Sequence, residues 1–114
     1  MTPTEIQKAV CAKHGSRFLE ADDALKCGCA IKTVGLNPIY GVRHAKCKGT
    51  TGWYIWAGEY SEDPAFFDPL CTSHLADYFP LTLSYLGLAP GYSFVIDADG
   101  YEDVWYSAEV EAKE

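Results

Sequence analysis

Residues 52–63 read GWYIWAGEYSED, and the rest of the chain can be interpreted outward from this stretch. Aromatic and β-branched residues suit the pleated, partly buried surface of a strand, so residues 52–57 are predicted to form one. Side chains alternate between the two faces of a strand, which puts Trp53 on one face and Tyr54 and Trp56 on the other. Because both faces are large and mostly apolar, we expect a central strand covered on both sides, with its tryptophans packed in the core.

Length and composition indicate an ordinary globular domain. The chain has 114 residues, of which 48% are hydrophobic, so a real core can form. It contains no run of 18 apolar residues, and we expect no membrane helix. The first ten residues lack the basic start and apolar run of a secretory signal, which predicts a cytoplasmic protein. Its five cysteines are then expected to stay reduced, and an odd number argues against a complete disulfide framework.

The net charge of −7 is unevenly distributed along the chain. Residues 1–50 carry eight Lys or Arg against four Asp or Glu, a balance of +4. Residues 51–114 carry one Lys against twelve Asp or Glu, a balance of −11. Such asymmetry predicts an acidic face and a basic partner, although acidic residues that serve only solubility are an alternative. Nucleic acid is a poor partner for the acidic half because phosphates would be repelled.

The order of predicted elements favours an α+β domain over residues 1–114. Thr2-Pro3-Thr4-Glu5 has the form of a capping box, and it predicts a helix over residues 3–14 that ends at Gly15. Asp-Gly within residues 97–100 predicts a hairpin turn. Further strands are predicted at residues 29–34, 39–47, 92–96 and 101–106, and short helices are predicted from Pro64, carrying Phe66 and Phe67, and around Leu75 to Phe79. We therefore expect a mostly antiparallel sheet with helices packed on it, an N-terminal helix within residues 1–15 and an acidic tail, residues 107–114, that frays.

Cysteine and histidine spacing leaves a zinc-stabilised adaptor open as an alternative. The relevant groups are Cys27-Gly28-Cys29, Cys71 with His74, and His44 with Cys47. Structural zinc sites usually show two clean CxxC-like pairs, and none is present here. Buried free thiols are the favoured interpretation, and no metal or cofactor is expected.

A small hydrolase is the second alternative. It would need a carboxylate, best supplied by Glu59, close to His44 or His74 in a deep pocket. Neighbouring acids such as Glu62 and Asp63 point to opposite faces of an extended chain and do not form a dyad by themselves. Glu59 follows Gly58 among aromatic residues and is the acid that we expect hydrogen bonds to hold in place. The glycines match neither GxGxxG nor a P-loop, so no nucleotide site and no catalytic residue are predicted.

Several short motifs occur in a fixed order within residues 27–106. They are Gly52-Trp53, Gly58-Glu59, Tyr85-Leu86, Pro90-Gly91, Phe94 and Glu102-Asp103-Val104-Trp105. In this pattern the chain resembles the immunity protein 33 family of bacterial polymorphic toxin systems, first recorded as a domain of unknown function. The family carries Gly-Trp-Arg in its central strand, and the third position here is Tyr54. The resemblance implies an α+β fold, no catalysis, and a cytoplasmic protein that binds and blocks a cognate toxin. It also implies a structural role for the motif residues Gly52, Trp53, Gly58, Glu59, Pro90, Gly91 and Trp105.

The resemblance and the charge asymmetry together suggest where a toxin would bind. Many toxins of such systems attack nucleic acids and present basic surfaces, which an acidic protein can occupy. Charge would speed association, and buried aromatic side chains would supply affinity. The candidate toxin contacts are the acids near exposed aromatics and those aromatics themselves: Tyr60, Glu62, Asp63, Asp97, Asp99, Tyr101, Glu102 and Asp103.

Overall fold

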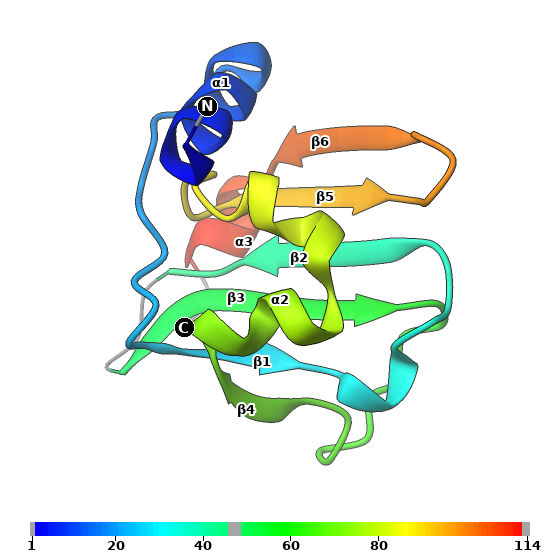
Figure 1. Cartoon of the computed structure of the whole chain (residues 1–114). Helices are drawn as coiled ribbons and strands as arrows, with labels where there is room; N and C mark the ends of the chain where they lie inside the picture. The colour runs from blue at the N-terminus through cyan, green and yellow to red at the C-terminus, as the bar shows by residue number, and fades with distance from the viewer. Residues whose placement is uncertain (1, 46–48, 113–114) are drawn as a thin grey trace.

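The computed structural model describes residues 2–45 and 49–112, and its sheet is built around the eight-residue strand β3 (Thr50–Ala57). Figure 1 shows the other elements arranged about this strand. The helices are α1 (Pro3–His14), α2 (Leu75–Tyr78) and α3 (Ala108–Ala112), with 3-10 helices η1 (Ile31–Thr33), η2 (Thr72–His74) and η3 (Pro80–Tyr85). The remaining strands are β1 (Lys26–Cys29), β2 (Ile39–Arg43), β4 (Asp68–Cys71), β5 (Tyr92–Ile96) and β6 (Glu102–Tyr106).

The six strands form one sheet in the order β4-β1-β3-β2-β5-β6. β1 and β3 run parallel, and every other neighbouring pair is antiparallel. The prediction of a mostly antiparallel α+β fold is therefore confirmed. The prediction of α1 is confirmed as well, because Thr2 and Glu5 form the capping box and Gly15 ends the helix in the left-handed conformation.

Helices cover one face of this sheet. In Figure 1, α2 and η3 lie in front of the strands, with α1 above them, and α3 lies behind the left end of the sheet. Trp53 and Ile55 point into the covered side, where they pack with Leu75, Leu88 and other apolar residues. The predicted burial of Trp53 is confirmed, since it is 1% exposed.

The opposite face is largely open, so the expectation of a strand covered on both sides is wrong. Tyr54 is 38% exposed and Trp56 is only partly buried. Among the described residues, α3 is the helix that lies on this side, at one end, where Nδ1 of His44 lies 3.2 Å from the carbonyl oxygen of Val110. An antiparallel sheet tolerates one solvated face, and two apolar faces of a strand do not by themselves supply two layers of helices.

The core contains a charged side chain that the sequence did not reveal. Arg43, at the end of β2, is 1% exposed and lies 5.6 Å over the Trp53 ring. Burial lowers the pKa of Arg43 to about 10, so it is still charged at neutral pH. Its guanidinium donates hydrogen bonds to the backbone carbonyls of Leu19, Glu20, Thr51, Leu86 and Leu88 at 2.7–3.3 Å. The indole Nε1 of Trp53 donates to the same Leu86 carbonyl at 3.0 Å.

Two predicted strands have different limits in the structure. The strand predicted at residues 29–34 is β1, which ends at Cys29, and the chain then turns through η1. The turn is fixed by Thr33, whose hydroxyl donates to the Ala30 carbonyl and accepts from the backbone N–H of Ala57. The strand predicted at residues 39–47 ends at Arg43, and residues 46–48 lie outside the described part of the chain.

The helix predicted from Pro64 is absent, and the strand β4 follows instead. The Asp63 carboxylate accepts a hydrogen bond from the Ala65 backbone N–H, which makes a turn rather than a helix. Pro69 lies within β4, where it is tolerated because β4 is an edge strand. The helix predicted around Leu75 to Phe79 is α2, one turn long between η2 and η3.

The C-terminal hairpin is confirmed, whereas the tail differs from the expectation. β5 and β6 pair as predicted, with β6 starting at Glu102 rather than Tyr101. The tail that was expected to fray forms α3 from Ala108 to Ala112. Its start is fixed by Ser107, whose N–H donates to the Gly91 carbonyl at 2.9 Å and whose own carbonyl accepts from Glu111.

Replacing Arg43 should be one of the most damaging single changes in this fold. Arg43→Met would leave several buried carbonyls without a donor, so we expect the free energy of unfolding to fall by about 3 kcal/mol or more. Urea unfolding measures this loss. The exposed Arg17 provides the control, and Arg17→Met should change stability by less than about 0.5 kcal/mol. Equal effects of the two variants would contradict a structural role for the buried guanidinium.

Candidate functional site

The two groups of candidate toxin contacts project from the same end of the sheet. Ala57 pairs with Ile39, and Ile39 pairs with Ile96. The strands β3 and β5 therefore end at the same edge of the sheet, on either side of β2. The loop after β3 and the hairpin turn after β5 therefore leave the sheet at one end, on the right in Figure 1. We call the exposed and partly exposed acids there the acidic end: Glu59, Glu62, Asp63, Asp97 and Asp99.

The acids of this end have different local roles. The Asp97 carboxylate accepts from the backbone N–H groups of Asp99 at 2.8 Å and Tyr101 at 3.0 Å, so it shapes the hairpin turn. Asp63 shapes the other loop in the same way. Glu62 and Asp99 are exposed, and their carboxylates form no hydrogen bond or ion pair with the described residues. Tyr60 and Tyr101, each 55% exposed, stand beside the two groups of acids.

Glu102 lies apart from the other candidates, on the helix-covered face. Its carboxylate accepts from Lys13 Nζ at 2.7 Å and from the Tyr85 hydroxyl at 2.5 Å, and lies 3.2 Å from His14 Nε2. The hydrogen bond from Lys13, followed by that from Tyr85, lowers the pKa of Glu102 to about 2. Burial, together with this hydrogen bond, raises the pKa of the Tyr85 hydroxyl. Glu102 thus ties β6 to α1 and η3, while its neighbour Asp103 is exposed on the opposite face.

The expectation that hydrogen bonds hold Glu59 is wrong. Glu59 is exposed and accepts no hydrogen bond from the described residues. Glu102 is instead an acid held by side chains of other elements, because the hairpin brings it against Lys13 and His14 at the C-terminal end of α1 and against Tyr85.

The family motif residues mostly shape the backbone. Gly52 has φ +89°, and a Cβ there would run into the carbonyl oxygen of His44. Gly91 has φ +97°, and its Cβ would overlap the Tyr106 ring. Both positions therefore require glycine. Pro90 is buried, whereas Trp105 is 43% exposed and does not belong to the core.

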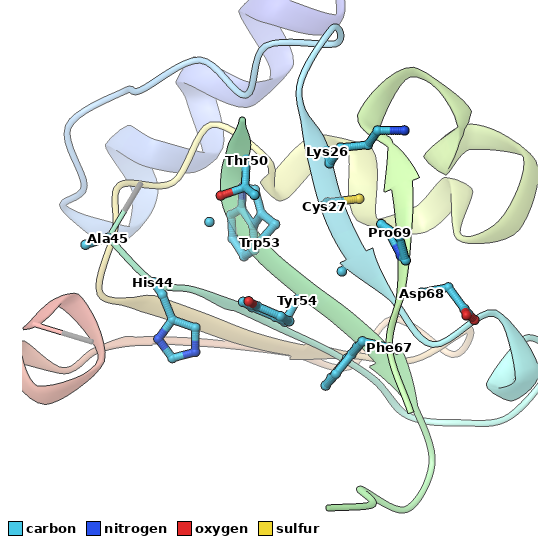
Figure 2. Close-up of a pocket in the computed structure, with 12 residues that line it drawn as sticks. Lys26, Cys27, His44, Ala45, Thr50, Trp53, Tyr54, Phe67, Asp68 and Pro69 are labelled. Carbon is cyan, nitrogen blue, oxygen red and sulfur yellow. The ribbon is translucent and has the colours of Figure 1, made fainter. Parts of the chain in front are cut away.

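The sheet face away from α1 and α2 carries aromatic side chains, among them Trp56, which was expected to pack in the core. We call it the open face and define it by Tyr40, Val42, Tyr54, Trp56, Phe67 and Trp105. The Tyr40 and Trp56 rings stack with centroids 5.2 Å apart, and Tyr54 meets Phe67 edge to face at 5.2 Å. Figure 2 shows Tyr54, His44 and Phe67 on the side of the strands away from the helix layer. Gly28 pairs with Tyr54 on the neighbouring strand, and because glycine has no side chain it leaves room for the Tyr54 ring.

A pocket of about 390 Å³ opens at one end of this face. It forms where β1 and β3 slip in register, since Lys26 pairs with Thr50 but Gly28 pairs with Tyr54. Figure 2 draws its lining, which includes Lys26, Cys27, His44, Tyr54, Phe67 and Asp68. Burial raises the pKa of the Cys27 thiol to about 11, so it is not a thiolate nucleophile at neutral pH.

The residues named for the hydrolase alternative are not brought together. Glu59 comes after the C-terminal end of β3. His44 lies opposite Gly52, near the start of β3, and His74 follows the end of β4, which pairs with the start of β1. Glu59 and the two histidines are therefore at opposite ends of the sheet. Within residues 2–45 and 49–112, no three His, Cys, Asp or Glu side chains are grouped so as to hold a metal ion. Cys47, named in the zinc alternative, lies outside the described residues. None of the helices described is both long and apolar enough to cross a membrane.

The network around Glu102 predicts a specific pH dependence of stability. The folded pKa of about 2 lies below the ordinary value of 4.5, so the stabilisation is complete above pH 4.5 and is lost as the pH falls toward 2. Glu102→Gln should lower the free energy of unfolding at pH 7 by about 1–2 kcal/mol. This deficit should shrink as the pH falls from 4.5 toward 2.

Chemical denaturation of both proteins across this pH range measures the difference. Glu59→Gln is the matched control, because Glu59 has the same side chain without partners, and its stability should follow the wild type at every pH. A Glu102→Gln deficit that stays constant down to pH 2 would show that the carboxylate charge does not stabilise the fold.

Comparison with protein families adds evidence that is independent of this geometry. Residues 6–107 match the family model described as the Imm33-like domain, which leaves only short ends of the chain outside the match. Neither curated proteins nor solved structures yielded a match. The match covers most of α1, the entire sheet and the helical segment packed on it. The chain therefore belongs to the Imm33-like domain family, a family of immunity proteins.

Proposed function

We propose that this chain is a cytoplasmic immunity protein that neutralises a cognate toxin by binding it, without catalysing a reaction. Membership of an immunity-protein family supports a toxin partner. The observation that carries the choice of surface is the acidic end, where two acid-bearing loops far apart in sequence leave the sheet side by side. Binding is favoured over catalysis because the family is one of immunity proteins and the described residues hold no metal-ligand cluster.

The proposed partner presents a basic surface. Residues 51–114 have a charge balance of −11, and their exposed carboxylates concentrate the attraction for a positively charged partner. The carboxylates of Glu62 and Asp99 have no partner among the described residues and would steer the encounter, while Tyr60 and Tyr101 would anchor it. A toxin that acts on nucleic acid needs a basic surface for phosphates, and acids bound there would exclude its substrate.

The hydrogen bonds that each candidate contact makes within the chain support different proposed roles. Asp63 and Asp97 hold their own turns and contribute charge from fixed positions. Glu102 is occupied by Lys13, His14 and Tyr85, so we assign it to the fold rather than to the interface. Asp103 lies on the other side of β6 and extends the candidate surface onto the open face.

The toxin encoded beside this gene provides the direct test of the function. Expressed alone, it should stop bacterial growth, and co-expression of this chain should restore growth through a stable complex of the two proteins. A purified toxin that this chain neither binds nor inhibits would overturn the proposal.

Reversing charge at the acidic end should slow association. The double variant Glu62→Lys, Asp99→Lys should reduce the association rate at low salt by about tenfold or more and weaken its salt dependence. Stopped-flow mixing at several ionic strengths measures both effects. The matched control is Asp77→Lys, Glu109→Lys, which makes the same change in net charge on exposed acids of α2 and α3. Equal slowing by the two double variants would mean that only net charge, and not the acidic end, guides the toxin.

A further inference from the structure

We propose that the open face of the sheet is the surface on which the toxin docks, and that it receives arginine side chains from the toxin. This inference rests on the proposed function and names both the surface that holds the partner and the chemistry of the contact. It assigns the acidic end to steering and the open face to the buried centre of the complex.

Strand register arranges the open face as two rows of side chains across the sheet. The first row contains Asp103, Val95, Tyr40 and Trp56. The second row contains Trp105, Ser93, Val42, Tyr54, Gly28 and Pro69. Neighbouring strands lie about 4.8 Å apart, so the six-strand row spans roughly 24 Å. That width suits a protein partner better than a small molecule.

The aromatic rings of this face are held in place by one another. Trp56 stacks on Tyr40, with ring planes 14° apart, and meets the Tyr60 ring edge to face at 5.2 Å. Tyr54 lies between Phe67, at 5.2 Å, and His44, at 5.4 Å. Docking on rings already held in this way loses little side-chain entropy, which favours affinity.

The charged residues on and around the open face favour a positively charged partner. Asp103 carries the only charge in the two rows, and Glu59, Glu62 and Asp63 lie on the loop whose Tyr60 packs against Trp56. Lys26 lies at the other end, beside the pocket. Aromatic rings flanked by carboxylates fit a guanidinium group, which stacks on the ring face and donates hydrogen bonds to the carboxylate. Aromatic residues and arginine are also the side chains enriched at interface centres.

The same charges disfavour other occupants. A second copy of this chain would bring another net charge of −7 and another Asp103 against the first. Nucleic acid could stack its bases on the rings, but its phosphates would meet the neighbouring acids. A basic protein surface satisfies both the rings and the carboxylates.

Two matched pairs of variants, tested against the toxin encoded beside this gene, decide the inference. Trp105→Ala removes an exposed ring from the open face, and Ile6→Ala is its control, since Ile6 is 37% exposed on α1. Asp103→Lys and Asp77→Lys make the same charge reversal on the open face and on α2. We expect the two open-face variants to raise the dissociation rate tenfold or more, and the two controls to change it less than twofold. Circular dichroism checks folding, and Asp103→Lys serves if Trp105→Ala fails to fold.

Footprinting of the wild-type complex tests the same surface without substitution. Hydroxyl-radical oxidation of Tyr54 and Trp105 should fall when the toxin binds, while oxidation of Tyr78 in α2 should not change. Blocking the toxin's arginines with phenylglyoxal should weaken the complex more than blocking its lysines by acetylation.

The outcomes separate this inference from the function on which it rests. If the wild type binds the toxin and the open-face variants dissociate like their controls, the docking surface is wrong and the immunity function stands. If lysine blocking is the more damaging, the surface stands and the arginine assignment is wrong. A dimer of this chain in sedimentation that Trp105→Ala abolishes would give the open face to a second copy and overturn the inference. A wild type that does not bind the toxin overturns both proposals.

Discussion

The buried guanidinium of Arg43 is the interaction on which the arrangement of the chain depends. No carboxylate partner offsets its charge among the described residues, so the cost of burial is met by backbone carbonyl dipoles from the connection after α1, from β3 and from the loop after η3. Each of these segments must be in place for the charge to be tolerated. The Trp53 indole reinforces the arrangement by donating to the Leu86 carbonyl. One side chain thereby fixes the helical layer to a single face of the sheet.

This asymmetry explains why the other face remains available. α1 and the segment from η2 to η3 are both used on the Arg43 side, and the short α3 shields only one end of the other side. The aromatic residues there shield one another instead, at a cost in stability. Tyr54 stays 38% exposed, and the enclosed Nε1 of Trp56 has no hydrogen-bond acceptor in the described residues. Selection for stability alone would favour polar residues at these positions, so a binding role accounts for them better.

Local signals in the sequence predicted local structure, and they failed where tertiary contacts decide. The capping box at Thr2 and the Asp-Gly turn of the hairpin act within a few residues, so α1 and the β5–β6 pair could be predicted. Arg43 ends an alternating strand, and nothing within β2 indicates that carbonyls from distant loops converge on it. The strand containing Pro69 was missed for the same reason, because its edge position is known only from the sheet order. The alternation of side chains also showed that β3 has two apolar faces. It could not predict that helices would cover only one of them. The candidate acids were found from their charge, whereas the separation of Glu102 from its neighbours required the fold.

The charge asymmetry of the sequence corresponds in part to charges that the fold uses internally. Two cations of the basic first half serve the fold, because Arg43 is buried and Lys13 is paired with Glu102. In the second half, the exposed acids Glu59, Glu62 and Asp99 gather around one end of the sheet, and their carboxylates have no partner among the described residues. Tyr60 connects that end to the open face through its contact with Trp56. A partner attracted electrostatically to the acidic end would therefore first meet the protein at the edge of the open face. There it could form short-range contacts with the aromatic rings. Because charge acts before contact and ring burial acts after it, the two surfaces would control association and dissociation separately.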